Sequence, residues 1–394
     1  MPALSAATIE PPGGAQPAPR ERPRYISSLD GIRGFGILFV LLFHYAAISD
    51  SPLVDHPAMT TAWIWVQMFF VQSGYLITAI LLGTTDMPLG AYLKRFYWRR
   101  AVRIFPIYFA YLGLFLVVFL LFHRPRGFGK EAPFLFSYTY NFIRLGHPGH
   151  LETAFVHFWS LAVEEQFYLV WPLLVFFLRG RRLKALLIGM VVLVPVFRLW
   201  FAHWLTLHGF TRYETGQDTS TFTLSQFDGF AFGAAIPVFR LNERLRRPKL
   251  WATVTVAGAL AIAGINFHAL GGRESHLMDN AQHVWAFSLV DFTFMMVIVH
   301  LTAPGYRGLF NARPLVRLGK IVYGLYVFHF AILLGVHRVA SRVGGPLAVW
   351  FLVGLAVCWL VAHLSYQHFE KRFLAMKDGR QDGRPGRREA ALGS

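Results

Sequence analysis

Ten apolar segments of near-spanning length recur along this chain of 394 residues and limit what it can fold into. They lie at about 31–48, 61–82, 101–122, 157–178, 183–205, 225–240, 250–270, 282–303, 320–338 and 346–369. A helix needs about 20 apolar residues to cross a bilayer, and most of these segments reach that length. At 55% hydrophobic and 15% charged, the chain is also too apolar for a soluble protein of this size. We therefore predict an all-α, polytopic membrane protein with about ten transmembrane helices, of which the glycine-rich segment 225–240 is the shortest.

The distribution of positive charge predicts how the helices are oriented. The net charge of +17 would suggest a nucleic-acid partner in a soluble protein, but here the basic residues lie between the apolar segments. With a cytoplasmic N-terminus, 28 of the 38 lysines and arginines fall on the inner side, as the positive-inside rule requires. We expect a multi-pass protein of the inner (plasma) membrane with both termini in the cytoplasm. Residues 1–24 and 374–394 are predicted to be a disordered tail and a basic tail.

The first apolar segment, LDGIRGFGILFVLLFH at 29–44, carries three ionisable side chains. Arg33 and His44 are eleven residues apart, so on a helix they share one face about 16 Å apart along the axis. Ionisable groups within a membrane helix usually face a bundle interior or a wet cavity. Asp30 lies too far from His44 to be its partner and is expected to neutralise Arg33. The alternative is an ordinary helix end followed by one packed histidine.

Two adjacent acids, Glu164 and Glu165, lie in the fourth segment at a depth near that of His44. Successive helical residues point about 100° apart, so one of the two acids at most can face a given partner. Glu164 and Tyr168 belong to the face that we expect to line a cavity. A histidine–glutamate pair would supply a general base with an orienting acid. Alternatively, either acid forms a structural ion pair with Arg198.

Other polar residues within or beside the segments have both a structural and a functional interpretation. Ser73 and Gly74 allow a close approach of either a helix or a ligand. Arg198 and Asp228 are expected to form a buried pair. Tyr326 and His329 are candidates for the core or for a site. The arginines Arg99, Arg100 and Arg103 either set the topology or bind a phosphate-rich ligand. The single cysteine, Cys358, excludes a disulfide or a cysteine-based metal site, and no metal site is predicted.

Five blocks in the order seen here resemble the acyltransferase 3 family of integral-membrane acyltransferases, over Leu29 to about Glu370. The blocks are LDGIRG…LFH, FFVQSGYLIT, RRAVRIFPIY, FWSLAVEEQFYLVWPLL and LGKIVYGLYVFH. The sequence departs from the family pattern at Gln72 and Val322, where an aliphatic residue and a serine are common. Some members continue into a soluble SGNH hydrolase-like domain, and we expect no such domain here. We therefore expect the membrane part or another protein to handle the acceptor.

The resemblance implies an acyltransferase domain at 25–373 that moves an acyl group, commonly acetyl from acetyl-CoA, to an acceptor hydroxyl. By this analogy His44 is the essential base or a transient acyl carrier. Arg33, with the cluster Arg99, Arg100 and Arg103, serves the donor together with the Ser73–Gly74 block. Acyl-CoA is then a substrate, and no permanently bound cofactor is expected. The implied acceptor is an extracytoplasmic carbohydrate or lipid-linked glycan, and no nucleic acid is involved.

Two other functions remain open at the level of the sequence. One is a proton-coupled transporter or flippase in which Asp30, Arg33, His44 and Glu164 form a proton relay. The other is a membrane interaction protein without catalytic activity. Dependence on CoA would separate the transferase from the transporter, and the effect of replacing His44 would separate it from the inactive protein.

Overall fold

The computed structural model describes residues 25–56, 62–123, 127–143, 145, 153–269 and 282–379, and these contain helices and turns but no strand. The elements are α1 (Ser27–Ile48), the 3-10 turn η1 (Pro52–Asp55), α3 (Ile64–Leu82), α4 (Leu89–Phe122), α5 (Phe128–Phe136), α6 (Tyr140–Ile143), η2 (Thr153–Phe155), α7 (Phe158–Phe177), α8 (Arg181–Leu207), α9 (Arg212–Thr221), η3 (Thr223–Gln226), α10 (Phe227–Val238), α11 (Leu241–Arg244), α12 (Pro248–Ala269), α13 (Gln282–Leu301), η4 (Leu309–Asn311), α14 (Arg313–Lys320), α15 (Val322–Val343), α16 (Leu347–Ser365), the π-turn η5 (Tyr366–Glu370) and α17 (Lys371–Gly379). The predicted tail 1–24 and most of the predicted tail 374–394 lie outside the described residues.

Seven stretches of helix in the described part are long and apolar enough to cross a membrane, which confirms an all-α, multi-pass membrane protein. They are α1, α3, α4, α7, α8, α15 and the continuous stretch Leu347–Met376. The three other predicted spans form α10, α12 and α13. With 12 residues, α10 is about 18 Å long, which is short of the roughly 30 Å of a bilayer core. The count of ten and the cytoplasmic position of the termini remain predictions.

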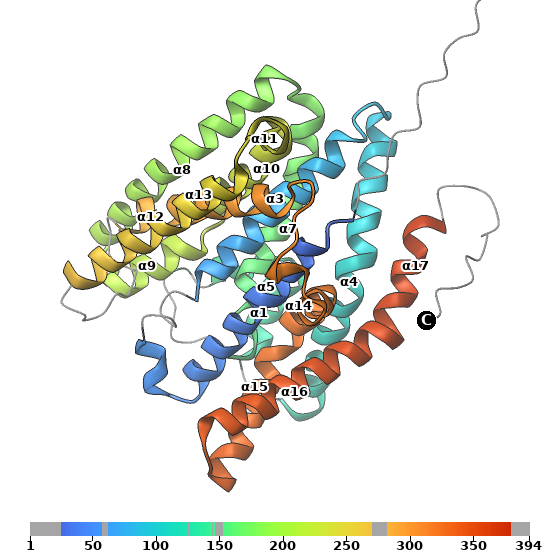
Figure 1. Ribbon diagram of the computed structural model, residues 1–394. Coiled ribbons are helices and arrows are strands. Elements are labelled where there is room, and N and C mark those ends of the chain that lie inside the picture. The colour runs from blue at the N-terminus through green and yellow to red at the C-terminus, as the bar shows by residue number, and fades with distance from the viewer. Residues whose placement is uncertain are drawn as a thin grey trace, which may run out of the picture.

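Close packing between helices fixes the centre of the bundle. Helix α1 packs against α14 and α15, and α3 packs against α10 (Figure 1). The last pair meets backbone to backbone, because a Cβ at Gly74 would lie 2.1 Å from the carbonyl oxygen of Phe230. Gln72, the first departure from the family pattern, is buried and donates its amide to the carbonyl of Leu29, 2.8 Å away. Gln72 thus joins α3 to the start of α1.

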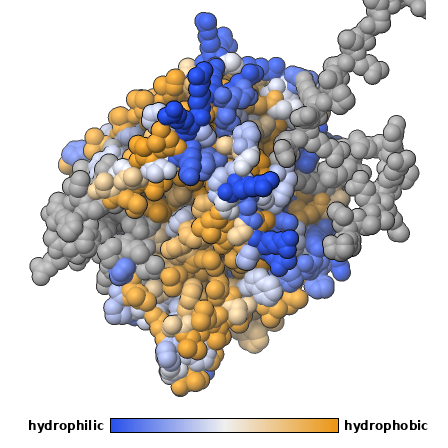
Figure 2. Space-filling model, in the orientation of Figure 1, coloured by the Kyte–Doolittle hydropathy of each residue, from blue (hydrophilic) through white to orange (hydrophobic). Residues whose placement is uncertain are grey.

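The outer surface of the bundle is apolar where it would meet lipid. Long aliphatic side chains stand exposed on α4, α8, α12 and α16, and two of them, Leu120 and Leu193, each expose 64% of their surface. Figure 2 shows apolar side chains over most of the visible face, with hydrophilic side chains gathered near α11 and α14. An exposed apolar surface of this extent fits a hydrocarbon environment.

The segment that follows α4 folds back against the bundle. The Tyr108 hydroxyl on α4 donates to the carbonyl of Leu135, 2.8 Å away. From α7, the Gln166 amide donates to the carbonyl of Tyr138, also at 2.8 Å. These bonds hold the segment that contains the short helices α5 and α6 against α4 and α7.

Candidate active site

A cavity of about 230 Å³ lies between α1, α3, α4, α7 and α15, and we call it the arginine cavity. It is lined by Arg33, Val66, Phe69, Phe70, Ser73, Leu76, Ile77, Ile80, Arg100, Arg103, Ile104, Ser160, Leu161, Glu164, Tyr168, Val322, Tyr323 and Tyr326. Four of the five blocks predicted from the sequence contribute a polar side chain, and the tyrosines of the fifth complete the wall. Residues far apart in the chain therefore form one pocket in which a few charged and hydroxyl side chains stand among apolar ones.

Three arginines converge on this cavity from two helices. Arg33 comes from α1, and its guanidinium lies 3.8 Å from the carboxylate of Asp30, which confirms the predicted ion pair. Arg100 and Arg103 come from α4, where Arg100 lies over the ring of Tyr168, 5.2 Å from its centroid. Arg99 is not among the lining residues, because it points from another face of α4. The cavity therefore has a strongly cationic wall, which suits an anionic ligand.

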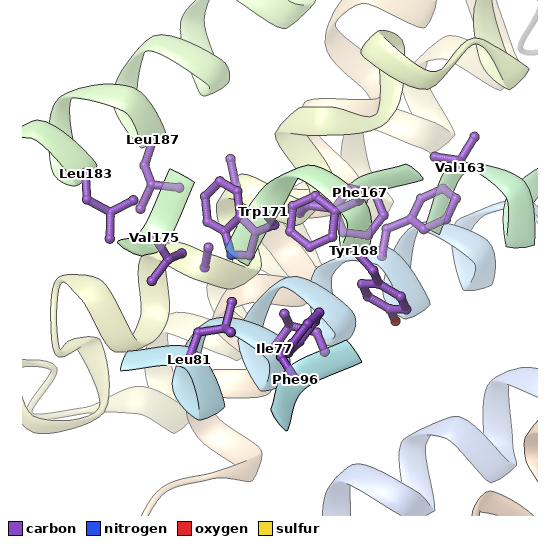
Figure 3. Packing of buried hydrophobic residues seen from close by; sticks show 14 of the residues in the cluster. Ile77, Leu81, Phe96, Val163, Phe167, Tyr168, Trp171, Val175, Leu183 and Leu187 are labelled. Atoms are coloured by element: carbon purple, nitrogen blue, oxygen red, sulfur yellow. The ribbon is translucent and has the colours of Figure 1, made fainter. Parts of the chain in front are cut away.

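A compact network of hydroxyls holds the one acid that lines the cavity. Ser73 and Tyr168 both donate to the carboxylate of Glu164, and the Tyr168 hydroxyl also lies 3.2 Å from Ser73 Oγ. In Figure 3 the Tyr168 side chain points away from Leu183 and Leu187, which pack on the opposite side of α7. The prediction that Gly74 serves a ligand is not supported, because the backbone of α10 occupies the space beside it.

The far wall of the arginine cavity is formed by two hydroxyl side chains, Ser160 and Tyr326. The Tyr326 hydroxyl donates to the carbonyl of His157 at 2.5 Å. Its single hydrogen is used there, so the Ser160 hydroxyl, 2.6 Å away, is the donor of the second bond. These bonds connect the cavity wall to the histidines behind it.

Three histidine rings from three parts of the chain meet behind this wall. The ring centroids of His44 and His329 are 5.0 Å apart, and those of His157 and His329 are 4.7 Å apart. His157 is 2% exposed, and neither of its ring nitrogens makes a well-aligned hydrogen bond to a described residue, although the carbonyls of Tyr326 and Val327 lie close by. The sequence analysis missed His157; its position directly before the acid-containing block, three residues before Ser160, is the signal that could have identified it.

Hydrogen bonds in this cluster fix which nitrogen of His44 carries a hydrogen. His329 Nδ1 lies 2.7 Å from the carbonyl of Tyr326, and because a carbonyl only accepts, Nδ1 is the protonated nitrogen. For neutral rings, His329 Nε2 is then an acceptor, so it receives the hydrogen of His44 Nδ1 at 3.0 Å. His44 Nε2 is left with a free lone pair, as a general base or a nucleophile requires.

The predicted pairing of His44 with Glu164 is wrong. His44 bonds to His329, whereas Glu164 bonds to Ser73 and Tyr168 on the arginine side of the Ser160–Tyr326 wall. The prediction compared depths along two helices, but depth does not say which faces of the helices meet. Glu165 lines a different cavity on the other side of α7, in agreement with the expectation that only one acid can face a given partner.

Arg198 pairs with Asp228, as predicted, and this excludes the alternative in which Arg198 pairs with Glu164 or Glu165. Both side chains are fully buried, with Arg198 Nη1 and Nη2 at 2.9 Å and 2.7 Å from the two Asp228 oxygens. Ser288, which the sequence analysis did not single out, donates to Asp228 at 2.6 Å. Neither charged side chain lines the arginine cavity.

Comparison with known proteins places the chain among related sequences. The model of a family described as "Acyltransferase domain" matches residues 26–365. The chain belongs to this family, acyltransferase 3. It is similar to O-acetyltransferase OatA of Staphylococcus aureus, with 26% identity over 367 residues, and to peptidoglycan O-acetyltransferase OatA of Listeria monocytogenes, with 27% identity over 362 residues. These alignments cover 88% of this chain but 57% and 55% of the relatives, so the chain spans little more than half of their length. No solved structure matches the chain.

In this acyltransferase 3 member, the family blocks contribute side chains to two different parts of the candidate site. The opening block contributes Arg33 to the cavity and His44 to the histidine cluster, on either side of the Ser160–Tyr326 wall. The last block supplies both Tyr326, which lines the cavity, and His329, which bonds to His44. Val322, the second departure from the family pattern, lines the cavity.

Proposed function

We propose that this protein transfers an acyl group, in the simplest case acetyl, from acyl-CoA to a hydroxyl of a carbohydrate acceptor. The observation that carries the proposal is the arrangement of a cationic cavity directly in front of a histidine with a free Nε2 lone pair. A transferase that uses CoA needs both features: cations for the phosphates of the donor and a base for the hydroxyl of the acceptor.

The arginine cavity suits the thioester arm of the donor. Its volume of about 230 Å³ is below the roughly 300–1,000 Å³ of pockets that enclose a whole drug-sized ligand. The narrow pantetheine arm would enter, while the phosphates would stay at the mouth beside Arg103, whose side chain is exposed. Arg33 and Arg100 would then lie deeper along the same path. The predicted topology puts this mouth on the cytoplasmic side, where acyl-CoA is made.

The chemistry follows from the free nitrogen of His44. In direct transfer, Nε2 takes the proton of the acceptor hydroxyl while that oxygen attacks the thioester carbonyl. The C–S bond breaks, and the proton on His44 then passes to the departing thiolate of CoA. In a two-step route, Nε2 itself attacks the carbonyl, the C–S bond breaks and the CoA thiolate leaves. The acceptor oxygen then attacks the acyl carbon, the bond from that carbon to Nε2 breaks, and the hydroxyl proton is taken up by the freed Nε2, which passes it to the thiolate. Both routes require the Tyr326 side chain to move, because it stands between the cavity and His44.

The acceptor class comes from the relatives, one of which is named as acting on peptidoglycan. We therefore propose a cell-envelope carbohydrate as the acceptor, either a wall glycan or another surface polysaccharide, presented at the outer face of the inner membrane. The relatives are longer than this chain, which matches little more than half of their length.

Label transfer from radiolabelled acetyl-CoA tests this function directly. Membranes that contain the wild-type protein, His44→Ala or the control His208→Ala would be incubated with the glycans of the host. His208 is an exposed histidine at the end of α8 and is not among the cavity-lining residues. We expect base-labile label in a glycan fraction with the wild type and the control, and none with His44→Ala at equal membrane abundance.

Two results would contradict the proposal. Full activity of His44→Ala would show that His44 is neither base nor acyl carrier. If the wild type transferred no label from acetyl-CoA or from longer acyl-CoA donors, the transporter hypothesis would replace the transferase.

A further inference from the structure

A second cavity of about 520 Å³ lies on the other side of α4 and α7, and we call it the lateral cavity. It shares Arg100 and Tyr168 with the arginine cavity, so these two side chains separate the two spaces. Glu165, Tyr138 and Trp98 also line it. Neither the comparisons nor the reaction proposed above assigns a ligand to this space.

Two buried polar groups of this cavity have no hydrogen-bond partner among the described residues. They are Oε1 of Glu165 and the hydroxyl of Tyr138. The ring of Tyr138 is held rigidly, stacked on Tyr108 with centroids 4.5 Å apart. Buried polar groups in proteins almost always have a hydrogen-bond partner. The unpaired Glu165 oxygen and Tyr138 hydroxyl therefore indicate a ligand that supplies hydrogen-bond donors.

The mouth of the lateral cavity opens between apolar side chains on two membrane-crossing helices. Leu169 on α7 is 64% exposed and Phe105 on α4 is 39% exposed, and both line the cavity. An opening flanked in this way faces the hydrocarbon of the bilayer, so a membrane lipid has direct access to it.

Positive charge lies on the same cavity. Lys94 is exposed and lines it one helical turn from Trp98, an arrangement typical of side chains at the membrane interface. The Arg100 guanidinium lies close to both Glu164 and Glu165 and offsets the charge of the two acids. A ligand phosphate would therefore meet Lys94, while its hydroxyl groups would reach Glu165 and Tyr138.

We propose that the lateral cavity binds a glycerophospholipid with an anionic phosphate and a hydroxylated head group. The phosphate pairs with Lys94, the head-group hydroxyls donate to Glu165 and Tyr138, and the acyl chains leave past Phe105 and Leu169. Lipid binding would be measured without the transfer reaction and on variants that leave the shared Arg100 and Tyr168 intact, so its failure would be distinct from failure of the proposed function.

Binding of three short-chain lipids to the purified protein in detergent would test the site. Dioctanoyl phosphatidylglycerol has the charge and the hydroxyls, dioctanoyl phosphatidylethanol has the charge alone, and dioctanoyl phosphatidylcholine is neutral overall. Dissociation constants from native mass spectrometry should rank them in this order, tightest first. Glycerol 3-phosphate, which carries the head group without the chains, should compete weakly because it lacks the apolar contacts.

The variants separate the two parts of the site. Glu165→Leu, which removes the acceptor oxygen, should weaken phosphatidylglycerol about three- to tenfold and leave phosphatidylethanol unchanged, because only the first lipid has head-group hydroxyls that need the acceptor. Tyr138→Phe, which keeps the stacked ring, should act in the same direction by about threefold. Lys94→Gln should weaken both anionic lipids equally. Lys184→Gln is the matched control, because Lys184 lies over the ring of Phe239, away from the cavity.

Three outcomes would overturn the inference. The first is equal affinity for phosphatidylglycerol and phosphatidylcholine. The second is an unchanged preference for phosphatidylglycerol over phosphatidylethanol in both Glu165→Leu and Tyr138→Phe. The third is displacement by glycerol 3-phosphate at the concentration where the lipid itself binds, which would show that the apolar mouth is not used.

Discussion

Replacing His329 with phenylalanine should lower kcat for acyl transfer about 10- to 150-fold and leave KM for the acyl donor unchanged. In the structure, His329 Nε2 lies 3.0 Å from His44 Nδ1 and accepts its hydrogen. When His44 takes a proton at Nε2, the ring becomes a cation, and this bond becomes a hydrogen bond from a charged donor. Such bonds contribute about 1.5–3 kcal/mol, and each 1.36 kcal/mol changes a rate tenfold.

His329 positions His44 by accepting the hydrogen of His44 Nδ1, so the test needs a variant that restores this hydrogen-bond acceptor. His329→Gln offers an amide oxygen to His44 Nδ1 and should retain kcat within about tenfold of the wild type. Phenylalanine fills the buried space but accepts no hydrogen bond. Both variants would be assayed with radiolabelled acetyl-CoA, and their thermal unfolding in detergent would show whether each is folded. His44→Ala supplies the baseline without the base.

The pattern of rates decides between a positioning role and a structural one. If the phenylalanine variant kept kcat within about twofold of the wild type, the tautomer argument would be refuted. The same conclusion would follow if both variants lost activity equally, together with a higher KM and a lower unfolding temperature, because that pattern reports a damaged core.

Two further predictions concern charged side chains. Arg103→Gln should raise KM for acetyl-CoA about tenfold and leave KM for S-acetylpantetheine, which lacks the nucleotide phosphates, unchanged. Arg99→Gln is the control, because Arg99 lines neither cavity. An equal effect on the KM of both donors would show that Arg103 does not bind the phosphates. Arg198→Leu should destabilise the protein by about 3–5 kcal/mol, because it leaves Asp228 charged and buried. The double variant Arg198→Leu/Asp228→Leu should recover part of this stability, measured by thermal unfolding. An unaltered unfolding temperature in the single variant would show that the pair is not important for stability.

The sequence determined those features that depend on a single helix or on composition. Hydropathy gave the all-α membrane architecture, since a chain in lipid must satisfy its backbone hydrogen bonds within helices. Spacing along one helix predicted the Asp30–Arg33 ion pair, and the resemblance predicted the family. Buried charge also predicted the Arg198–Asp228 pair, because a membrane interior tolerates an arginine only with a partner.

Contacts between helices were decided by the tertiary structure. Helical periodicity states which residues share a face, but it does not state which face meets which neighbour. For this reason Glu164 was assigned to His44, whereas the packing of α1, α7 and α15 gives His44 a histidine partner and puts Glu164 beside Ser73. Gly74 likewise had two interpretations in the sequence, and the approach of α10 decided between them. The free Nε2 of His44 depends on a carbonyl of α15, 282 residues further along the chain, so no local pattern could have predicted it.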